Sequence, residues 1–113
     1  MIALDTNVLV RYIVQDDPNQ AARASRFIDK SISTDNKAFI AVIVLCELVW
    51  VLESRYRFSW AQVAAVIEKL LAAGEFMVEA RKSVIIAHHH YRVSGADFVD
   101  CLLGLLAQDV GCK

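Results

Sequence analysis

Short apolar runs along the chain alternate with longer segments in which apolar residues recur at helical spacing. Met1–Leu4, Ala38–Val42 and Phe76–Val78 are brief and rich in aliphatic or aromatic residues, so each is predicted to form a buried strand. Two helical segments follow each predicted strand. This repeated order of strand, helix and helix predicts an α/β domain, in which helices flank a parallel β-sheet.

Capping signals set the expected ends of the helices. The turn after the first strand places Thr6 or Asn7 near the cap of the first helix. Asp17 is a candidate N-cap for the second helix, because Pro18 suits the first helical position. Ser59 opens a capping box that starts a later helix. We expect the remaining helices over Val44–Tyr56, from Ser59 to Gly74, over Arg81–Val93 and over Asp97–Val110.

Composition narrows the class of protein. The 113 residues are 57% hydrophobic and 22% charged, which fits one globular domain whose core needs neither a disulfide nor a metal. The formal net charge is −1, so a nucleic-acid substrate would require a local binding site rather than a basic surface. The apolar run from Ala38 to Leu52 is broken by Glu47 and is shorter than the roughly 20 residues that span a bilayer. The acid at position 5 does not suit a secretory signal peptide, and the three cysteines form no C-x-x-C pair. Residues 1–113 are therefore expected to form one soluble, cytoplasmic domain.

Three carboxylates stand in apolar segments. Asp5 ends the first strand, Glu47 is the one polar residue between Ala38 and Leu52, and Asp100 lies in an apolar helix start without a nearby Lys or Arg. Burying a charged carboxylate is costly unless it is paired or bound to a metal. A divalent cation would relieve the repulsion among clustered carboxylates, and ligation by oxygen alone favours Mg²⁺ or Mn²⁺. Ligands of open parallel sheets bind beyond the carboxyl ends of the strands, where the first two acids are expected.

Each of these acids also has a purely structural interpretation. Asp5 could cap the first helix, Glu47 could extend into solvent from a helix edge, and Asp97 with Asp100 could form an acidic version of a capping box. Most other acids, Glu79 among them, lie in polar surroundings and are expected on solvated faces.

Other residues with chemical potential have simpler explanations. His88, His89 and His90 are consecutive, so their side chains diverge by about 100° on a helix and are predicted to lie on its surface rather than to bind a metal. Trp50 is expected to pack in the core or in a dimer. The arginines are scattered, and we interpret them as surface groups that favour solubility, although guanidinium groups can contact RNA phosphates.

The acids lie in three longer motifs. These are M-I-A-L-D-T-N-V-L-V-R-Y at the start, L-C-E-L-V-W-V-L in the middle and G-A-D-F-V-D-C-L-L near the end. In this order and at these separations, they resemble the PIN-domain ribonucleases, and most closely the VapC toxins of bacterial toxin–antitoxin pairs. The resemblance implies a PIN-like α/β fold and a Mg²⁺- or Mn²⁺-dependent endoribonuclease. It also implies a homodimer and silencing by a VapB-type antitoxin.

By this resemblance, Asp5, Glu47 and Asp100 match the first three catalytic acids of the family, and Asp97 matches a position that is often acidic. All four are then candidate metal ligands. Asp5 and Asp100 would hold the metal directly or through water, and Glu47 would orient or deprotonate the attacking water.

Thr6 and Asn7 have two open interpretations. They would position a phosphate or a metal-bound water near the N-terminus of the following helix, or they would simply cap that helix.

Family members continue into a last strand that carries a further acid, and nothing in this sequence matches it. If the chain ends at Lys113, the resemblance implies weak activity and a tendency to associate. Two other functions stay open. One is a catalytically inactive PIN module that binds an antitoxin or RNA, and the other is a receiver-like, Mg²⁺-binding signalling domain.

Overall fold

A computed structural model describes residues 1–15, 18–33 and 35–112. Its elements are β1 (Ile2–Ala3), α1 (Thr6–Val14), α2 (Pro18–Ser31), β2 (Ala38–Ile40), α3 (Val42–Ser54), α4 (Trp60–Ala72), β3 (Phe76–Val78), α5 (Arg81–Ser94) and α6 (Phe98–Asp109). The strands form one parallel sheet in the order β1-β2-β3. Ile2 lies opposite Ala38, and Ala38 lies opposite Phe76. The predicted α/β class is therefore confirmed.

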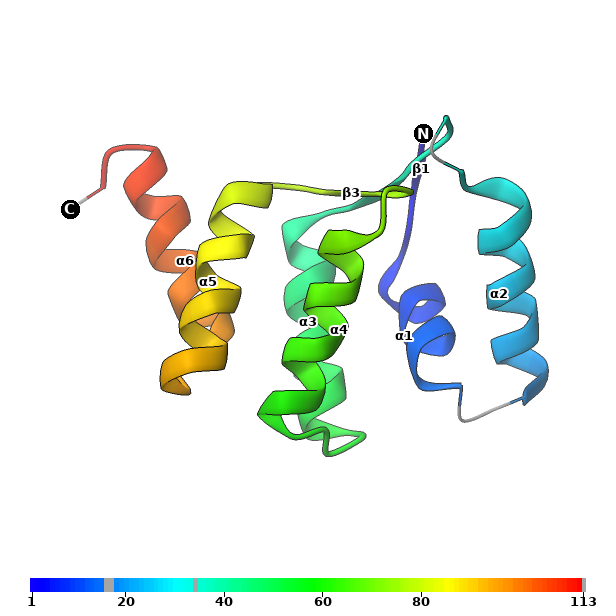
Figure 1. Ribbon diagram of the computed structural model, residues 1–113, viewed down its shortest axis with the longest axis horizontal. Coiled ribbons are helices and arrows are strands. Elements are labelled where there is room, and N and C mark those ends of the chain that lie inside the picture. Colours follow the sequence, from blue (N-terminus) through cyan, green and yellow to red (C-terminus); the bar gives the residue numbers. More distant parts are fainter. Residues whose placement is uncertain (16–17, 34, 113) are drawn as a thin grey trace.

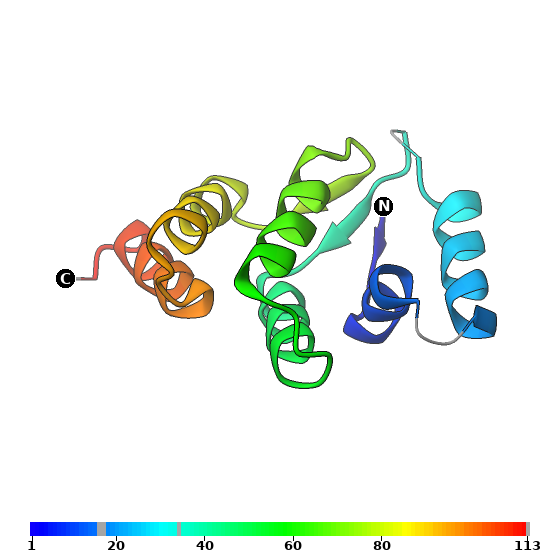
Figure 2. The same ribbon diagram turned by 60° about the horizontal axis from the view of Figure 1, so that its bottom comes forward.

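The molecule is elongated, with principal extents of 45, 32 and 19 Å. Figure 1 shows α1 and α2 at one end, α3 and α4 in the middle, and the hairpin of α5 and α6 at the other end. The turned view in Figure 2 separates the strands from the helices that follow them. Each parallel strand is left by a helix at its carboxyl end, so α1 and α3 start at the same edge of the sheet.

The core forms where α3 and α4 pack near the sheet. Leu48, Leu52, Val63 and Ile40 are fully buried there. The apolar run of α3 is therefore a core segment. Burying each large aliphatic side chain stabilises the fold by about 1.5–3 kcal/mol. No helix within the described ranges is both long and apolar enough to cross a membrane.

The helix ends differ from the expected ones at α1 and α3. Asp5, not Thr6 or Asn7, is the N-cap of α1. The third helix begins at Val42, two residues earlier than expected, because the strand before it ends at Ile40. Its cap residue offers no side-chain acceptor, and the Val42 backbone N–H donates instead to Glu79 Oε1 at 2.8 Å. Glu79 therefore caps a helix far away in sequence, which its polar surroundings did not indicate.

Other boundaries agree closely with the sequence. Pro18 is the first residue of α2, whereas Asp17 lies outside the described residues. The capping box at the start of α4 is formed, with the Ser59 hydroxyl accepting from the Gln62 backbone N–H at 3.2 Å. The fifth helix ends at Gly95, whose φ of 72° is the left-handed conformation that favours glycine.

Candidate acidic site

Asp5 leaves β1 and caps α1. The Val8 backbone N–H donates to Asp5 Oδ1 at 2.8 Å, so the structural interpretation of this acid is confirmed. The side chain is also exposed. Because a carboxylate has two oxygens and several acceptor positions, this single bond does not use up its capacity to bind a cation.

Glu47 lies on the solvent side of α3. It is exposed although its neighbours Leu48 and Val49 are buried, so the apolar run around it does not bury the carboxylate as the sequence pattern suggested. The Thr6 hydroxyl donates to Glu47 Oε2 at 3.2 Å across 41 positions of sequence. This contact joins the start of α1, next to Asp5, to the middle of α3.

Asp97 and Asp100 lie at the start of α6. Asp97 is the N-cap, and its Oδ1 accepts from the Asp100 backbone N–H at 2.9 Å, which confirms the capping interpretation of Asp97. Both side chains are exposed. Asp100 occupies the first turn, where a negative charge interacts favourably with the helix dipole.

Glu47, Asp97 and Asp100 line one open hollow of about 380 Å³, which we call the acidic hollow. Its other lining residues are Ile43, Cys46, Trp50, Glu53 and Val99. Trp50 is 64% exposed, so it does not pack in the core of this chain, and its packing in a dimer stays a prediction. It lies outside the core because it follows Glu47 by nearly one helical turn and shares its outward face.

The donor set of this region fits a hard divalent cation in its chemistry, because every candidate ligand is a carboxylate oxygen and the carboxylates are accessible. In the arrangement of the described residues, no three His, Cys, Asp or Glu side chains are grouped closely enough to hold a metal ion. Mg²⁺ commonly uses only one or two carboxylates and keeps several waters. A hydrated ion therefore suits these residues better than a fully enclosed one.

Burial and the charge of Asp97 both raise the pKa values of two nearby side chains. Burial raises the pKa of the Cys46 thiol, and the negative charge of Asp97 raises it further. Burial also raises the pKa of Tyr91, as do its hydrogen bond to Glu53 and the charges of Glu53 and Asp97. The Tyr91 hydroxyl donates to Glu53 Oε2 at 3.0 Å, which links α5 to α3 beside the acidic hollow.

Replacing Tyr91 with Phe is expected to change how stability depends on pH. At neutral pH, the loss of the bond to Glu53 should cost about 1 kcal/mol. Because folding raises the pKa of Tyr91, its contribution is complete below the ordinary tyrosine pKa of about 10 and is lost as the pH rises above it. The wild type should therefore lose stability more steeply than Tyr91→Phe above about pH 10 in urea unfolding at a series of pH values. A Tyr12→Phe control should parallel the wild type, and parallel curves for all three proteins would contradict the prediction.

Thr6 and Asn7 border a second hollow, between α1 and α3. It has a volume of about 300 Å³ and we call it the polar hollow. Its lining consists of Thr6, Asn7, Val10, Arg11, Gln20, Val51, Arg55 and Tyr56. The arginines are scattered along the sequence, and their positions alone did not indicate that two of them share a hollow. Arg11 follows Asn7 by four residues, so both lie on one face of α1. This spacing is a sequence signal that could have indicated Arg11 as a candidate site residue.

The histidine run is a helix surface, as expected. His88 is half-buried, with its Nε2 2.9 Å from the Ala64 backbone oxygen, while His89 and His90 are exposed.

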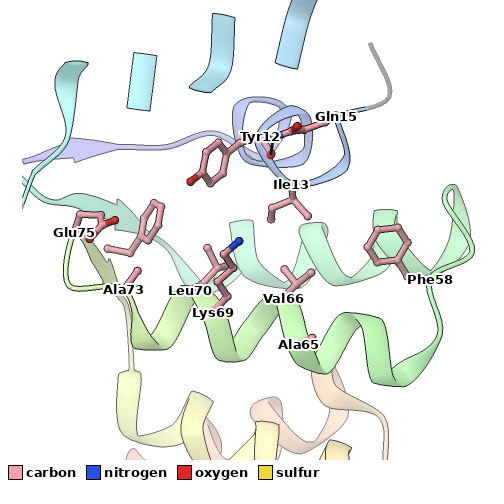
Figure 3. A pocket seen from close by; sticks show the side chains of 11 residues that line it. Tyr12, Ile13, Gln15, Phe58, Ala65, Val66, Lys69, Leu70, Ala73 and Glu75 are labelled. Carbon is pink, nitrogen blue, oxygen red and sulfur yellow. Dashed lines mark hydrogen bonds between the residues drawn. The ribbon is translucent and has the colours of Figure 1, made fainter. Parts of the chain in front are cut away.

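A third, more apolar groove separates α1 from α4. Figure 3 shows Tyr12, Ile13, Val66 and Phe58 around it, with Lys69 extending into the same space. It shares no residue with the acidic hollow. This groove and the candidate acidic site are therefore separate in this fold.

The fold is an α/β domain with a parallel sheet and with exposed acids at the starts of α1 and α6. Comparison with known proteins identifies its family. The sequence matches the PIN domain family over residues 2–113, so the chain belongs to this family. It is also similar to a VapC ribonuclease of Aquifex aeolicus (strain VF5), with 27% identity over 113 residues that cover 100% of this chain and 83% of that protein. No solved structure gives a significant match. The resemblance inferred from the three motifs is confirmed, and the receiver-like alternative is not supported.

Proposed function

We propose that the protein is a VapC-like endoribonuclease that uses Mg²⁺ or Mn²⁺ to cleave RNA in the cytoplasm. Asp5, Glu47, Asp97 and Asp100 are its acidic site. The observation that carries this proposal is the position of Glu47, which is bonded to Thr6 beside Asp5 and shares the acidic hollow with the two acids of α6. The acids of α3 and α6 share this hollow, whereas Asp5 lies outside its lining and next to Thr6 in the sequence.

A bound divalent cation would supply an activated water and charge neutralisation of the phosphate oxygens. Asp5 and Asp100 are the proposed ligands, with Asp97 assisting, because their carboxylates are exposed at the first turns of α1 and α6. Glu47 is the proposed base that orients the attacking water and accepts its proton. The Thr6 hydroxyl holds Glu47 in place, since it donates to Oε2.

Thr6 and Asn7 are the proposed contacts to the scissile phosphate. Both residues lie at the start of α1, where the positive end of the helix dipole favours an anion. The Asn7 amide would donate to the phosphate, and Thr6 would donate through its backbone N–H, because its single hydroxyl proton is donated to Glu47. The same two residues border the polar hollow, so a phosphate bound there would be next to both hollows.

A VapB-type antitoxin is the proposed inhibitor and a homodimer the proposed assembly, following the similarity to a VapC ribonuclease. Exposed apolar side chains support a protein-contact surface on α3 and α6, because Ile43, Trp50 and Leu103 are 68%, 64% and 65% exposed.

Cleavage of RNA in the presence of metal tests this function. The purified chain should cleave a mixed-sequence, single-stranded RNA with Mg²⁺ or Mn²⁺, and EDTA should stop the cleavage. Products are resolved on a denaturing gel, and an Asp5→Asn protein prepared in parallel controls for contaminating nucleases. If wild type and Asp5→Asn release product equally, the activity does not belong to this site. If the folded wild type binds RNA but never cleaves it, the inactive PIN module is the correct alternative.

A further inference from the structure

The polar hollow combines positive charge with an opening beside the candidate chemistry. Arg11 and Arg55 line it from α1 and from the end of α3, and no carboxylate belongs to its lining among the described residues. Both arginines are exposed. A guanidinium group is always charged and has five N–H donors in a planar fork that matches the oxygens of a phosphate. The lining is therefore suited to an anion.

Helix spacing and one hydrogen bond relate the polar hollow to Glu47. Glu47, Val51 and Arg55 follow one another at intervals of four residues, so they form one stripe along α3. With a rise of 1.5 Å per residue, Arg55 lies about 12 Å beyond Glu47 along the helix axis. Thr6 belongs to both places, because it lines the polar hollow and donates to Glu47.

We propose that Arg11 and Arg55 bind the backbone phosphates of the RNA on one side of the bond that is cut. This inference rests on the RNA substrate proposed above. Four exposed carboxylates repel a polyanion, and the formal net charge of −1 gives no general attraction. The two guanidinium groups of the polar hollow, which Thr6 links to Glu47, would offset that repulsion along the part of the strand that leads to Glu47.

An acidic peptide could also satisfy two arginines, but the surroundings favour RNA. The remaining polar lining residues carry hydroxyl and amide groups, which suit phosphate and sugar oxygens; they are Thr6, Asn7, Gln20 and Tyr56. An RNA strand that is cut at Glu47 must cross the acidic site, so groups that bind its phosphates are needed close to Glu47. An acidic peptide does not need to bind close to Glu47.

RNA binding without cleavage tests the inference separately from the proposed function. A fluorescein-labelled, 12-nucleotide single-stranded RNA is titrated in EDTA, and anisotropy is read at several salt concentrations. The double variant Arg11→Gln/Arg55→Gln should bind at least about tenfold more weakly than the wild type. The slope of log K against log salt should also fall by about 1.4, since each phosphate contact to a single strand contributes about 0.7.

The charge-matched control is Arg26→Gln/Arg92→Gln, which removes two exposed arginines from α2 and α5. It should bind RNA as the wild type does. Arg11→Lys/Arg55→Lys should keep the salt slope and lose affinity, because lysine keeps the charge without the planar fork. Circular dichroism confirms that every variant compared is folded.

The outcomes separate the two proposals. Equal weakening by the double variant and its control overturns the inference, as does a wild type that binds no RNA. The inference also fails if the double variant binds RNA normally but loses affinity for a labelled oligoglutamate peptide. If RNA binding depends on Arg11 and Arg55 but no cleavage occurs with Mn²⁺, the inference stands and the proposed nuclease function fails.

Discussion

Replacing Glu47 with Gln is expected to lower the rate of metal-dependent RNA cleavage by at least about a hundredfold. The amide has nearly the same volume and can still accept the bond from Thr6, so α1 and α3 should stay together. It cannot take a proton from water, and general-base catalysis contributes roughly 10²- to 10⁴-fold. Single-turnover cleavage of a labelled RNA, with enzyme in excess, measures the chemical step directly.

Glu68→Gln is the matched control for this result. Glu68 is an exposed glutamate on α4, outside both the acidic and the polar hollows, so its loss changes net charge equally without touching the proposed site. It should cleave at the wild-type rate. If Glu47→Gln keeps more than about a third of that rate, Glu47 is not the base and its exposure on α3 has another purpose.

Replacing Phe98 with Ala is expected to destabilise the fold by about 3–5 kcal/mol, the cost of removing a fully buried aromatic ring. Phe98 is 1% exposed and lies edge to face against Tyr91, with ring centroids 6.1 Å apart and planes at 82°. A domain of this size is stable by only about 5–15 kcal/mol, so the variant should unfold at a much lower urea concentration. Equilibrium unfolding followed by circular dichroism measures the shift.

The control on the same helix is Leu103→Ala. Leu103 is 65% exposed, so its truncation should change the free energy of unfolding by no more than about 0.5 kcal/mol. A similar loss from both substitutions would show that the cost does not come from the packing of Phe98 on α5.

The sequence predicts the fold well because its signals are local. The capping box at Ser59 and the glycine at position 95 determine helix ends within a few residues of themselves. The start of α3 is different, because its cap comes from Glu79, which is 37 positions away from the N–H that it accepts. No pattern around Val42 contains that information.

The candidate site was predicted from apolar surroundings, and the physical reason for the prediction was only partly correct. Asp5, Glu47 and Asp100 were expected to be costly buried charges, yet all three are exposed. Their segments are apolar because the opposite face of each element is in the core. Arg11 and Arg55 were interpreted as scattered surface groups for the reverse reason, since they line one hollow only when α1 packs against α3.

The hairpin of α5 and α6 gives the proposed site a dynamic property. Asp97 and Asp100 belong to this hairpin, whose helices pack mainly on each other and on α4, whereas Asp5 and Glu47 belong to helices that leave the sheet. Proteins open in cooperative pieces as well as globally. An excursion that undocks the hairpin would separate the two pairs of acids and leave β1, β2 and β3 paired. If the proposed site binds a metal, this docking equilibrium would set the fraction of molecules competent to bind it, and a ligand that holds the hairpin against α3 would increase that fraction.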